Sequence, residues 1–331
     1  MTLKEKILYI KGRKNPNGYS FNPFDYFTNR RRAKFICLII IVGFVFELLC
    51  LFGVTSWQKL LSATNLVNSV KQQDSNFIVY YLDVGQSDCT IVICDNEVLM
   101  IDTGTINQLK NIRTNLYMLE IETIDYMLLT HPHDDHIGSA ADIIKHYSVS
   151  NILMPEISAE NPVTTLTYDN LIDIISENNV NPESVSYGDS FMLGSAVVEI
   201  LAPINQDENI NNMSAIIKIT YGNTSFLFMG DAEEKIEKQI LREKIDVSAN
   251  MLKVGHHGSN TSSTDAFISA VNPEYIVVSA GSDNNYGHPT LDNIEKFVDL
   301  GIKPYITSFD GHITVTSDGE KLTIISENNK N

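Results

Sequence analysis

The spacing of apolar positions changes near residue 57 and divides the chain into two parts. Residues 35–56 read FICLIIIVGFVFELLCLFGVTS, apolar on nearly every helical face, with Glu47 as their one acidic side chain. A helix needs about 20 apolar residues to span the hydrocarbon core of a bilayer. This stretch therefore predicts a transmembrane helix.

Two other interpretations of residues 35–56 are weaker. A buried core helix is disfavoured because the stretch is apolar all round and directly follows a run of basic residues, RRRAK. A cleavable signal peptide normally has a short region before its apolar run, whereas 34 residues precede this one. We therefore expect an uncleaved anchor, followed by a polar stalk over residues 57–76.

From residue 77 onward the apolar runs are short and rich in β-branched residues, which is typical of strands. Strands are expected at residues 77–83, 89–95, 97–102, 124–130, 197–201, 215–221, 224–229, 251–254 and 275–280, with two or three more at the end. Helices are expected at residues 138–147, 165–179, 233–243, 264–271 and 291–300. This order predicts an α+β domain over residues 77–331, in which two packed sheets are covered outside by helices as a four-layer αββα sandwich.

The distribution of charge orients the anchor. Residues 1–34 carry nine basic and two acidic side chains, a net charge of +7. Because the whole chain has a net charge of −17, residues 35–331 have a net charge of −24. By the positive-inside rule the basic tail at residues 1–34 lies in the cytoplasm, and the domain lies outside a single-pass cell-membrane helix. The acidic excess argues against a protein that coats nucleic acid non-specifically, because phosphate binding needs clustered lysine and arginine.

The polar cluster after the strand at residues 124–130 carries the candidate chemistry. It reads HPHDDHIG, which places three imidazoles and two carboxylates within six residues. Alternate residues of an extended segment point the same way, so His131 and His133 can reach one ion. Asp135 and His136, at the start of the next helix, can turn to a second ion. Imidazole with carboxylate suits zinc, or manganese or iron where oxygen ligands dominate. A solvated polar loop is the alternative.

The arrangement His-x-His-x-Asp-His between a strand and a helix resembles the metallo-β-lactamase fold superfamily of metallohydrolases, and the resemblance extends over about residues 77–326. LDVGQSDCTIVI and LMIDTG are similar to its opening strands. The phrases DVGQ, GDAE, KVGHHGS and YGHPT are similar to the extracellular hydrolase domain of the ComEC competence family. Only one spanning segment accompanies that domain here, in place of the family's multi-helix channel, so DNA uptake by this chain alone is not expected.

The resemblance implies a ligand set for two divalent metal ions, zinc or manganese. The implied ligands are His131, His133, Asp135, His136, Asp231 and His256. Asp231 occupies the place of the acid that bridges the ions, and Asp102 the place of a carboxylate that orients metal-binding histidines. The third histidine of the first ion's shell is missing from NINNMSAI, where Asn212 or a water can substitute.

Three residues receive catalytic roles from the resemblance: Asp135, His257 and His288. His256 is preferred to His257 as the ligand because Gly-His-x-x-Ser/Thr follows the superfamily pattern, which leaves His257 to act outside the metal shell or on the transition state. His288, in GHPT, can stabilise a reacting phosphate or protonate a leaving group, although a surface-loop histidine is the alternative.

These features lead to the expectation of a membrane-anchored, outward-facing phosphodiesterase that uses a metal-bound hydroxide. Its substrate is expected to be DNA or phosphorylcholine-type groups on a cell-wall polymer, and no protein partner is expected. A β-lactamase or lactonase is an alternative because the fold hosts many hydrolyses. A membrane-tethered binding protein with a vestigial metal site is a second alternative, suggested by the missing histidine.

Overall fold

The computed structural model describes residues 75–328, apart from residues 159, 161, 179, 181 and 283. The basic tail, the expected anchor and nearly all of the expected stalk lie outside the described residues, so these remain predictions. Among the described helices, none is both long and apolar enough to cross a membrane.

Eight strands form the first sheet: β1 (Phe77–Tyr81), β2 (Thr90–Cys94), β3 (Glu97–Ile101), β4 (Thr123–Leu128), β5 (Ser148–Met154), β6 (Pro182–Ser184), β14 (Ile313–Ser317) and β15 (Leu322–Ser326). Their order is β15-β14-β1-β2-β3-β4-β5-β6. The pairs from β3 to β6 are parallel and therefore need crossover connections. These contain α5 (Leu109–Met118), α6 (Asp134–Ile137), α7 (Ala140–His146) and α8 (Leu166–Glu177).

Seven strands form the second sheet: β7 (Ser190–Leu193), β8 (Ala196–Ala202), β9 (Ile216–Tyr221), β10 (Thr224–Phe228), β11 (Met251–Lys253), β12 (Tyr275–Val278) and β13 (Lys303–Ile306). Their order is β13-β12-β11-β10-β9-β8-β7, again antiparallel at one end and parallel from β10 to β13. The parallel crossovers contain α9 (Glu234–Arg242), α10 (Asp265–Val271) and α11 (Leu291–Asp299). A short helix, α12 (Thr307–Asp310), follows β13.

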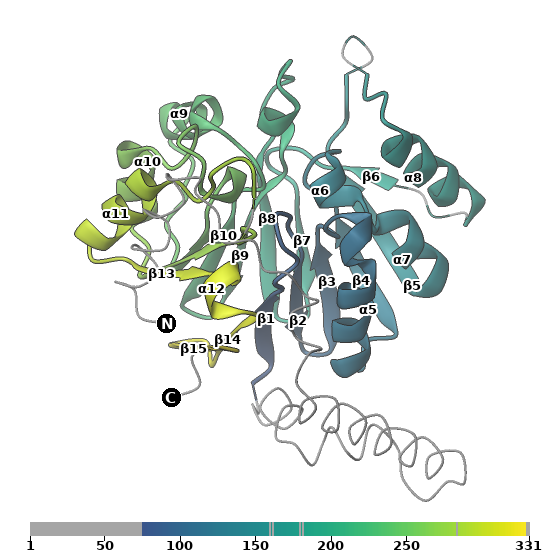
Figure 1. Cartoon of the computed structure of the whole chain (residues 1–331), viewed down its shortest axis with the longest axis horizontal. Helices are drawn as coiled ribbons and strands as arrows, with labels where there is room; N and C mark the ends of the chain where they lie inside the picture. The colour runs from purple at the N-terminus through teal and green to yellow at the C-terminus, as the bar shows by residue number, and fades with distance from the viewer. Residues whose placement is uncertain are drawn as a thin grey trace, which may run out of the picture. The chain divides into compact units, whose positions relative to one another are not determined.

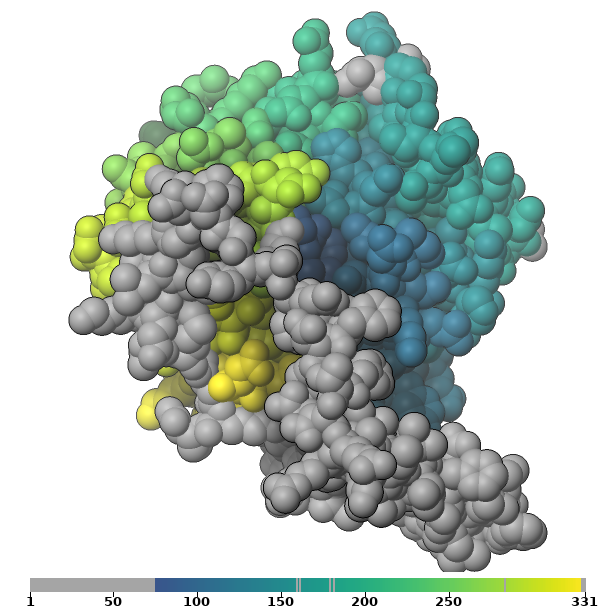
Figure 2. Space-filling view, viewed as in Figure 1, coloured from purple at the N-terminus to yellow at the C-terminus, as the bar shows by residue number. Residues whose placement is uncertain are grey.

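The two sheets pack face to face, and the helices cover their outer faces (Figure 1). The blue and teal first half and the green and yellow second half lie on opposite sides of the face shown in Figure 2. This arrangement confirms the predicted αββα sandwich.

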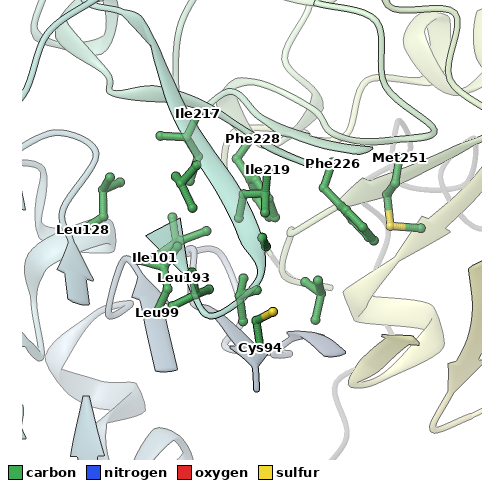
Figure 3. Close-up of a cluster of buried hydrophobic side chains, with 14 of the residues drawn as sticks. Cys94, Leu99, Ile101, Leu128, Leu193, Ile217, Ile219, Phe226, Phe228 and Met251 are labelled. Atoms are coloured by element: carbon green, nitrogen blue, oxygen red, sulfur yellow. The ribbon is translucent and has the colours of Figure 1, made fainter. Parts of the chain in front are cut away.

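The alternation of side chains along β10 shows why the sheet is buried on both faces. Phe226 and Phe228 point into the core between the sheets, while Leu227 packs toward the helices of the second layer. Ile217 and Ile219 of β9 join the inter-sheet core, opposite Leu99 of β3 (Figure 3). Burying one such side chain contributes roughly 1.5–3 kcal/mol, so the facing strands hold the two halves together strongly.

Five of the helices and strands were not predicted from the sequence, namely α5, α12, β5, β6 and β7. Helix α5 buries only Ile112 and Leu116, so its apolar stripe is too narrow to stand out. Strand β5 begins with the sequence SVSN, which is mostly polar and not buried, and it is buried only over its last three residues. These elements are stabilised by the layers that pack on them rather than by a local pattern.

The topology brings candidate residues from both sheets to one region. Candidate residues follow β3 and β4 of the first sheet and β10, β11 and β12 of the second, all of which have parallel neighbours. In open α/β sheets the carboxyl ends of parallel strands are where ligands bind. The loops that follow these strands therefore position the site.

Candidate metal centre

Three groups of histidine and aspartate side chains meet at these strand ends; two of them share Asp231, and the third consists of Asp88, Asp102 and His136. The first cluster consists of His131, His133 and Asp231. The second cluster consists of Asp135, His136, Asp231 and His257. Within each cluster, one potential ligand atom per residue lies within 4.8 Å of all the others. This spacing fits one metal ion per cluster.

The carboxylate of Asp231 stands between the imidazole rings. Its Oδ2 lies 3.8 Å from His131 Nε2 and 3.7 Å from His257 Nε2. Its Oδ1 lies 3.4 Å from His136 Nε2. The backbone N–H of Asp231 donates to Ser214 Oγ at 3.0 Å, which fixes the turn that presents the carboxylate.

Local backbone geometry aims the ligands. His133 is still extended, with φ −81° and ψ 149°, and α6 begins at the next residue, so HPHDDH changes from strand-like to helical in the middle. His257 has φ 51° and Asp102 has φ 59°, in the left-handed region that few side chains adopt. Such strained residues cluster at functional sites, where the surrounding structure holds them in place.

The buried polar atoms of the second cluster fit a cation. His136 Nε2 and Asp231 Oδ1 are buried, face each other and have no hydrogen-bond partner among the described residues. Buried polar atoms in native proteins are nearly always paired. A divalent ion bound by both atoms would satisfy them, so the residues present fit a metal.

Asp102 holds His136 from behind. His136 Nδ1 donates to Asp102 Oδ2 at 2.7 Å, and Thr130 donates to the same carboxylate through its backbone N–H and its hydroxyl, each at 2.8 Å. Because Nδ1 is bound to Asp102, Nε2 is the nitrogen that faces the second cluster.

The electrostatics of the centre favour bound cations. Burial alone would lower the pKa of His257, but Asp231 and Asp88 outweigh it and raise this pKa to about 10. In the same way Asp231 and Asp102 overcome burial and raise the pKa of His136 well above its usual value. Burial would raise the pKa of Asp231, yet the neighbouring imidazoles keep it well below its usual value. A site that holds protons this strongly also attracts metal ions.

The two histidines of the first cluster, His131 and His133, are neutral, because burial lowers the pKa of both rings. Burial, assisted by the nearby His136 ring, lowers the pKa of His131 well below its usual value. Its Nε2 lies 3.0 Å from His133 Nδ1, so both rings present a nitrogen to the same point. A neutral imidazole is the form that binds a metal ion.

Comparison with known proteins gives the same fold. Residues 82–169 match the family model described as the metallo-beta-lactamase superfamily. ComE operon protein 3 of Bacillus subtilis is 31% identical over 170 residues, which cover 51% of this chain and 21% of that protein. Competence protein ComA of Neisseria gonorrhoeae is 28% identical over 266 residues, which cover 78% of this chain and 35% of that protein. The chain carries a ComEC-like metallo-β-lactamase domain.

A solved structure supports the fold of this metallo-β-lactamase domain. CmlA, a diiron β-hydroxylase from Streptomyces venezuelae, superimposes with a TM-score of 0.51 at 15% identity, over 74% of this chain and 55% of that one. The chain spans only 21% to 35% of the length of the competence and recombination proteins it matches.

His256 lies outside both clusters of the metallo-β-lactamase domain, although the sequence favoured it over His257 as a ligand. Its Nδ1 lies 3.1 Å from Thr261 Oγ1 and 3.3 Å from Glu233 Oε1, and its Nε2 is 4.0 Å from Asp231 Oδ2. The side chain of His256 is 23% exposed, whereas that of His257 is 3% exposed. The turn therefore directs His257 inward and His256 toward the cavity wall.

Asn212 is turned away from the clusters. Its Oδ1 accepts a hydrogen bond from the backbone N–H of Glu233 at 3.3 Å. The preceding residue, Asn211, lines the cavity beside the clusters, and its buried Oδ1 has no hydrogen-bond partner among the described residues. Of these two amides, that of Asn211 is the one that has an unpaired oxygen and lines the cavity.

An open cavity of about 410 Å³ lies over the clusters. His288 lines it, with its ring 5.4 Å from that of His256 and 5.9 Å from that of Tyr286. Burial and the nearby His256 lower the pKa of His288 to about 4, so it is neutral at pH 7. Tyr286, 74% exposed, stands at the rim.

Two charged residues beside the centre were missed by sequence reasoning. Asp88 lies in the GQSD turn and Lys253 in LKVGHHGS, and both are buried. Lys253 could have been noticed in the sequence, because a lysine at the end of an apolar strand is expected to be buried and therefore to need a charged partner. Its partner, however, lies in the other sheet and is far away in sequence.

Proposed function

We propose that the domain is a metal-dependent phosphodiesterase, held at the cell membrane by residues 35–56 with the N-terminus in the cytoplasm and the domain outside. The observation that carries the proposal is Asp231, whose carboxylate belongs to both clusters at one open cavity. Paired divalent ions a few ångströms apart suit displacement at phosphorus, because they stabilise the attacking and the leaving oxygens.

The proposed ligands follow the clusters. His131, His133 and Asp231 hold the first ion, with Asn211 as the residue placed to supply an amide oxygen. The second ion is held by Asp135, His136, Asp231 and His257. Imidazole nitrogen with carboxylate oxygen favours zinc, and the oxygen-rich second cluster also suits manganese.

When bound, the two ions would lower the pKa of a water molecule and withdraw charge from phosphoryl oxygens. The chain's own residues orient the metal ligands and bind the phosphoryl group. Asp102 keeps Nε2 of His136 directed at the centre. His288, neutral at pH 7, donates a hydrogen bond to a phosphoryl oxygen rather than a proton to the leaving group, because its low pKa leaves few protonated rings.

Within this proposal a single DNA strand is the favoured substrate. The similar proteins are named for competence and recombination, processes that handle DNA. Among the described residues that line the cavity none is lysine or arginine, so the ions and His288 must bind the reacting phosphate. The exposed ring of Tyr286 offers a surface on which a base can stack.

The test uses the full chain in mild detergent with zinc or manganese. We expect hydrolysis of bis(p-nitrophenyl) phosphate and of single-stranded DNA, and none of a chromogenic cephalosporin. Asp231→Asn removes the shared charge and should abolish activity, while Asp246→Asn, an acid outside both clusters, should keep it. Preference for p-nitrophenyl phosphorylcholine would replace DNA by a cell-wall polymer as substrate. Metal binding without hydrolysis of any ester would favour the binding-protein alternative.

A further inference from the structure

A buried ion pair joins the two sheets beside the second cluster. Lys253 Nζ lies 2.6 Å from Asp88 Oδ2, and the two side chains are 2% and 7% exposed. Asp88 precedes β2 of the first sheet, and Lys253 is the last residue of β11 of the second. The pair therefore spans the interface at the level where both sheets supply ligands.

Asp88 also contacts both ends of the second cluster. Its Oδ1 lies 3.3 Å from His257 Nδ1. Its backbone N–H donates to the carbonyl oxygen of Asp135 at 3.1 Å. One residue thus touches a ligand that follows β11 and a ligand that follows β4.

The surroundings of His257 determine which nitrogen faces the centre. Nδ1 lies 3.0 Å from the carbonyl oxygen of Ser279 and 3.3 Å from Asp88 Oδ1, and both neighbours can only accept a hydrogen bond. Nδ1 therefore carries the hydrogen. The Nε2 atom is left to face Asp135 Oδ2 at 3.2 Å and Asp231 Oδ2 at 3.7 Å.

Stability alone does not account for this pair. Two charges lose their hydration on burial, and well-packed apolar residues of similar volume often stabilise a protein equally well. Asp88 Oδ1 is buried and makes no regular hydrogen bond among the described residues, so the salt bridge through Oδ2 is what holds it toward His257. The arrangement directs a carboxylate at a ligand.

We propose that Asp88 is a positioning residue for the second metal ion and that Lys253 is the counter-ion that holds it. Asp88 orients the His257 ring and links it to the backbone of Asp135, so that the two ligands keep their separation across the sheet interface. This inference rests on the proposed function only in requiring that the second cluster binds a metal.

The test is a Co²⁺ titration of the full chain, in which absorption by cobalt reports each bound ion and its geometry. Asp88→Asn/Lys253→Met removes both charges together, so that neither is left buried alone. Loss of such an outer partner typically weakens metal binding about 10- to 100-fold. We expect that loss for the ion bound by the second cluster, with an altered cobalt spectrum, and unchanged binding of the other ion.

The matched control is Lys218→Met/Asp246→Asn, which removes another lysine–aspartate pair, 2.6 Å apart and outside both clusters. It should bind both ions like the wild type. Lys253→Arg keeps the charge but lengthens the arm, so it should displace the Asp88 carboxylate and weaken binding of the second ion measurably, by about two- to tenfold. This variant decides the question if the double variant does not fold.

The outcomes separate the two proposals. Unchanged second-ion affinity and spectrum in the double variant, or in Lys253→Arg where the former is unfolded, would overturn the positioning role while leaving the proposed function intact. Equal weakening of both ions, matched by the control, would show a merely structural pair and also overturn it. A wild-type chain that binds no Co²⁺, Zn²⁺ or Mn²⁺ would overturn the proposed function as well.

Discussion

Removing the carboxylate of Asp102 should destabilise the domain even when no metal is bound. Asp102 is 1% exposed and accepts three hydrogen bonds, from His136 Nδ1 and from the backbone N–H and hydroxyl of Thr130. Leaving a buried donor unpaired costs about 1–3 kcal/mol. Asp102→Ala abandons all three donors, so a loss of about 3–9 kcal/mol in the free energy of unfolding is expected.

Asp102→Asn refines the estimate. In the wild type the Thr130 hydroxyl and His136 Nδ1 both donate to Asp102 Oδ2. The side-chain oxygen of the asparagine can accept both of these hydrogen bonds, but its NH₂ group then faces the backbone N–H of Thr130. The expected loss is therefore that of one abandoned donor, about 1–3 kcal/mol. Asparagine also tolerates the left-handed backbone at this position, where φ is 59°.

The assay is urea denaturation followed by circular dichroism, with EDTA present so that metal binding does not contribute. Thr130→Val is the control, because it removes one hydroxyl and leaves the other two hydrogen bonds to Asp102. Its loss should be about 1 kcal/mol. If Asp102→Ala lost less stability than Thr130→Val, the reasoning would be refuted, because water or a rearranged backbone would then satisfy the three donors.

Four further predictions concern the site and its surroundings. His133→Ala should reduce kcat/KM for bis(p-nitrophenyl) phosphate by roughly 100-fold or more, with an unchanged far-UV spectrum because the His133 side chain is exposed. Tyr286→Ala should raise KM for that substrate about 3- to 10-fold with little change in kcat, since stacking of one ring contributes about 0.5–1.5 kcal/mol; an unchanged KM would remove Tyr286 from the substrate site. The Lys218 ammonium lowers the pKa of Asp246 to about 2, so Asp246 contributes stability above its unfolded-state pKa near 4 that is lost as the pH falls toward 2. Because Asp246 is largely exposed, Asp246→Asn should cost only about 0.5–1 kcal/mol at pH 7, and its unfolding curve should approach that of the wild type as the pH falls below about 2. Finally, when free metal is present at about a hundred times its Kd, removing it should lower the free energy of unfolding by about 2.7 kcal/mol per site. This loss is measured as a fall in Tm that added zinc reverses.

The strands and the two histidines of the first cluster follow from local patterns. The consecutive apolar residues Phe226, Leu227 and Phe228 indicate a strand that is buried on both faces. This pattern involves only neighbouring residues, so it can be recognised in the sequence. His131 and His133 lie on one extended segment, so their convergence is a property of strand geometry. The domain type could be predicted for the same reason, because its motifs lie within single strand-to-loop units.

The tertiary structure decided what depends on direction and on distant partners. The sequence pattern favoured His256 over the adjacent His257 as a ligand, whereas the left-handed turn at these residues directs His257 inward and His256 to the cavity wall. Asp88 and Lys253 meet only because the two sheets pack face to face, with 164 intervening residues between them. Local sequence determines backbone periodicity over a few residues, whereas a contact between strand ends depends on the packing of both sheets at once.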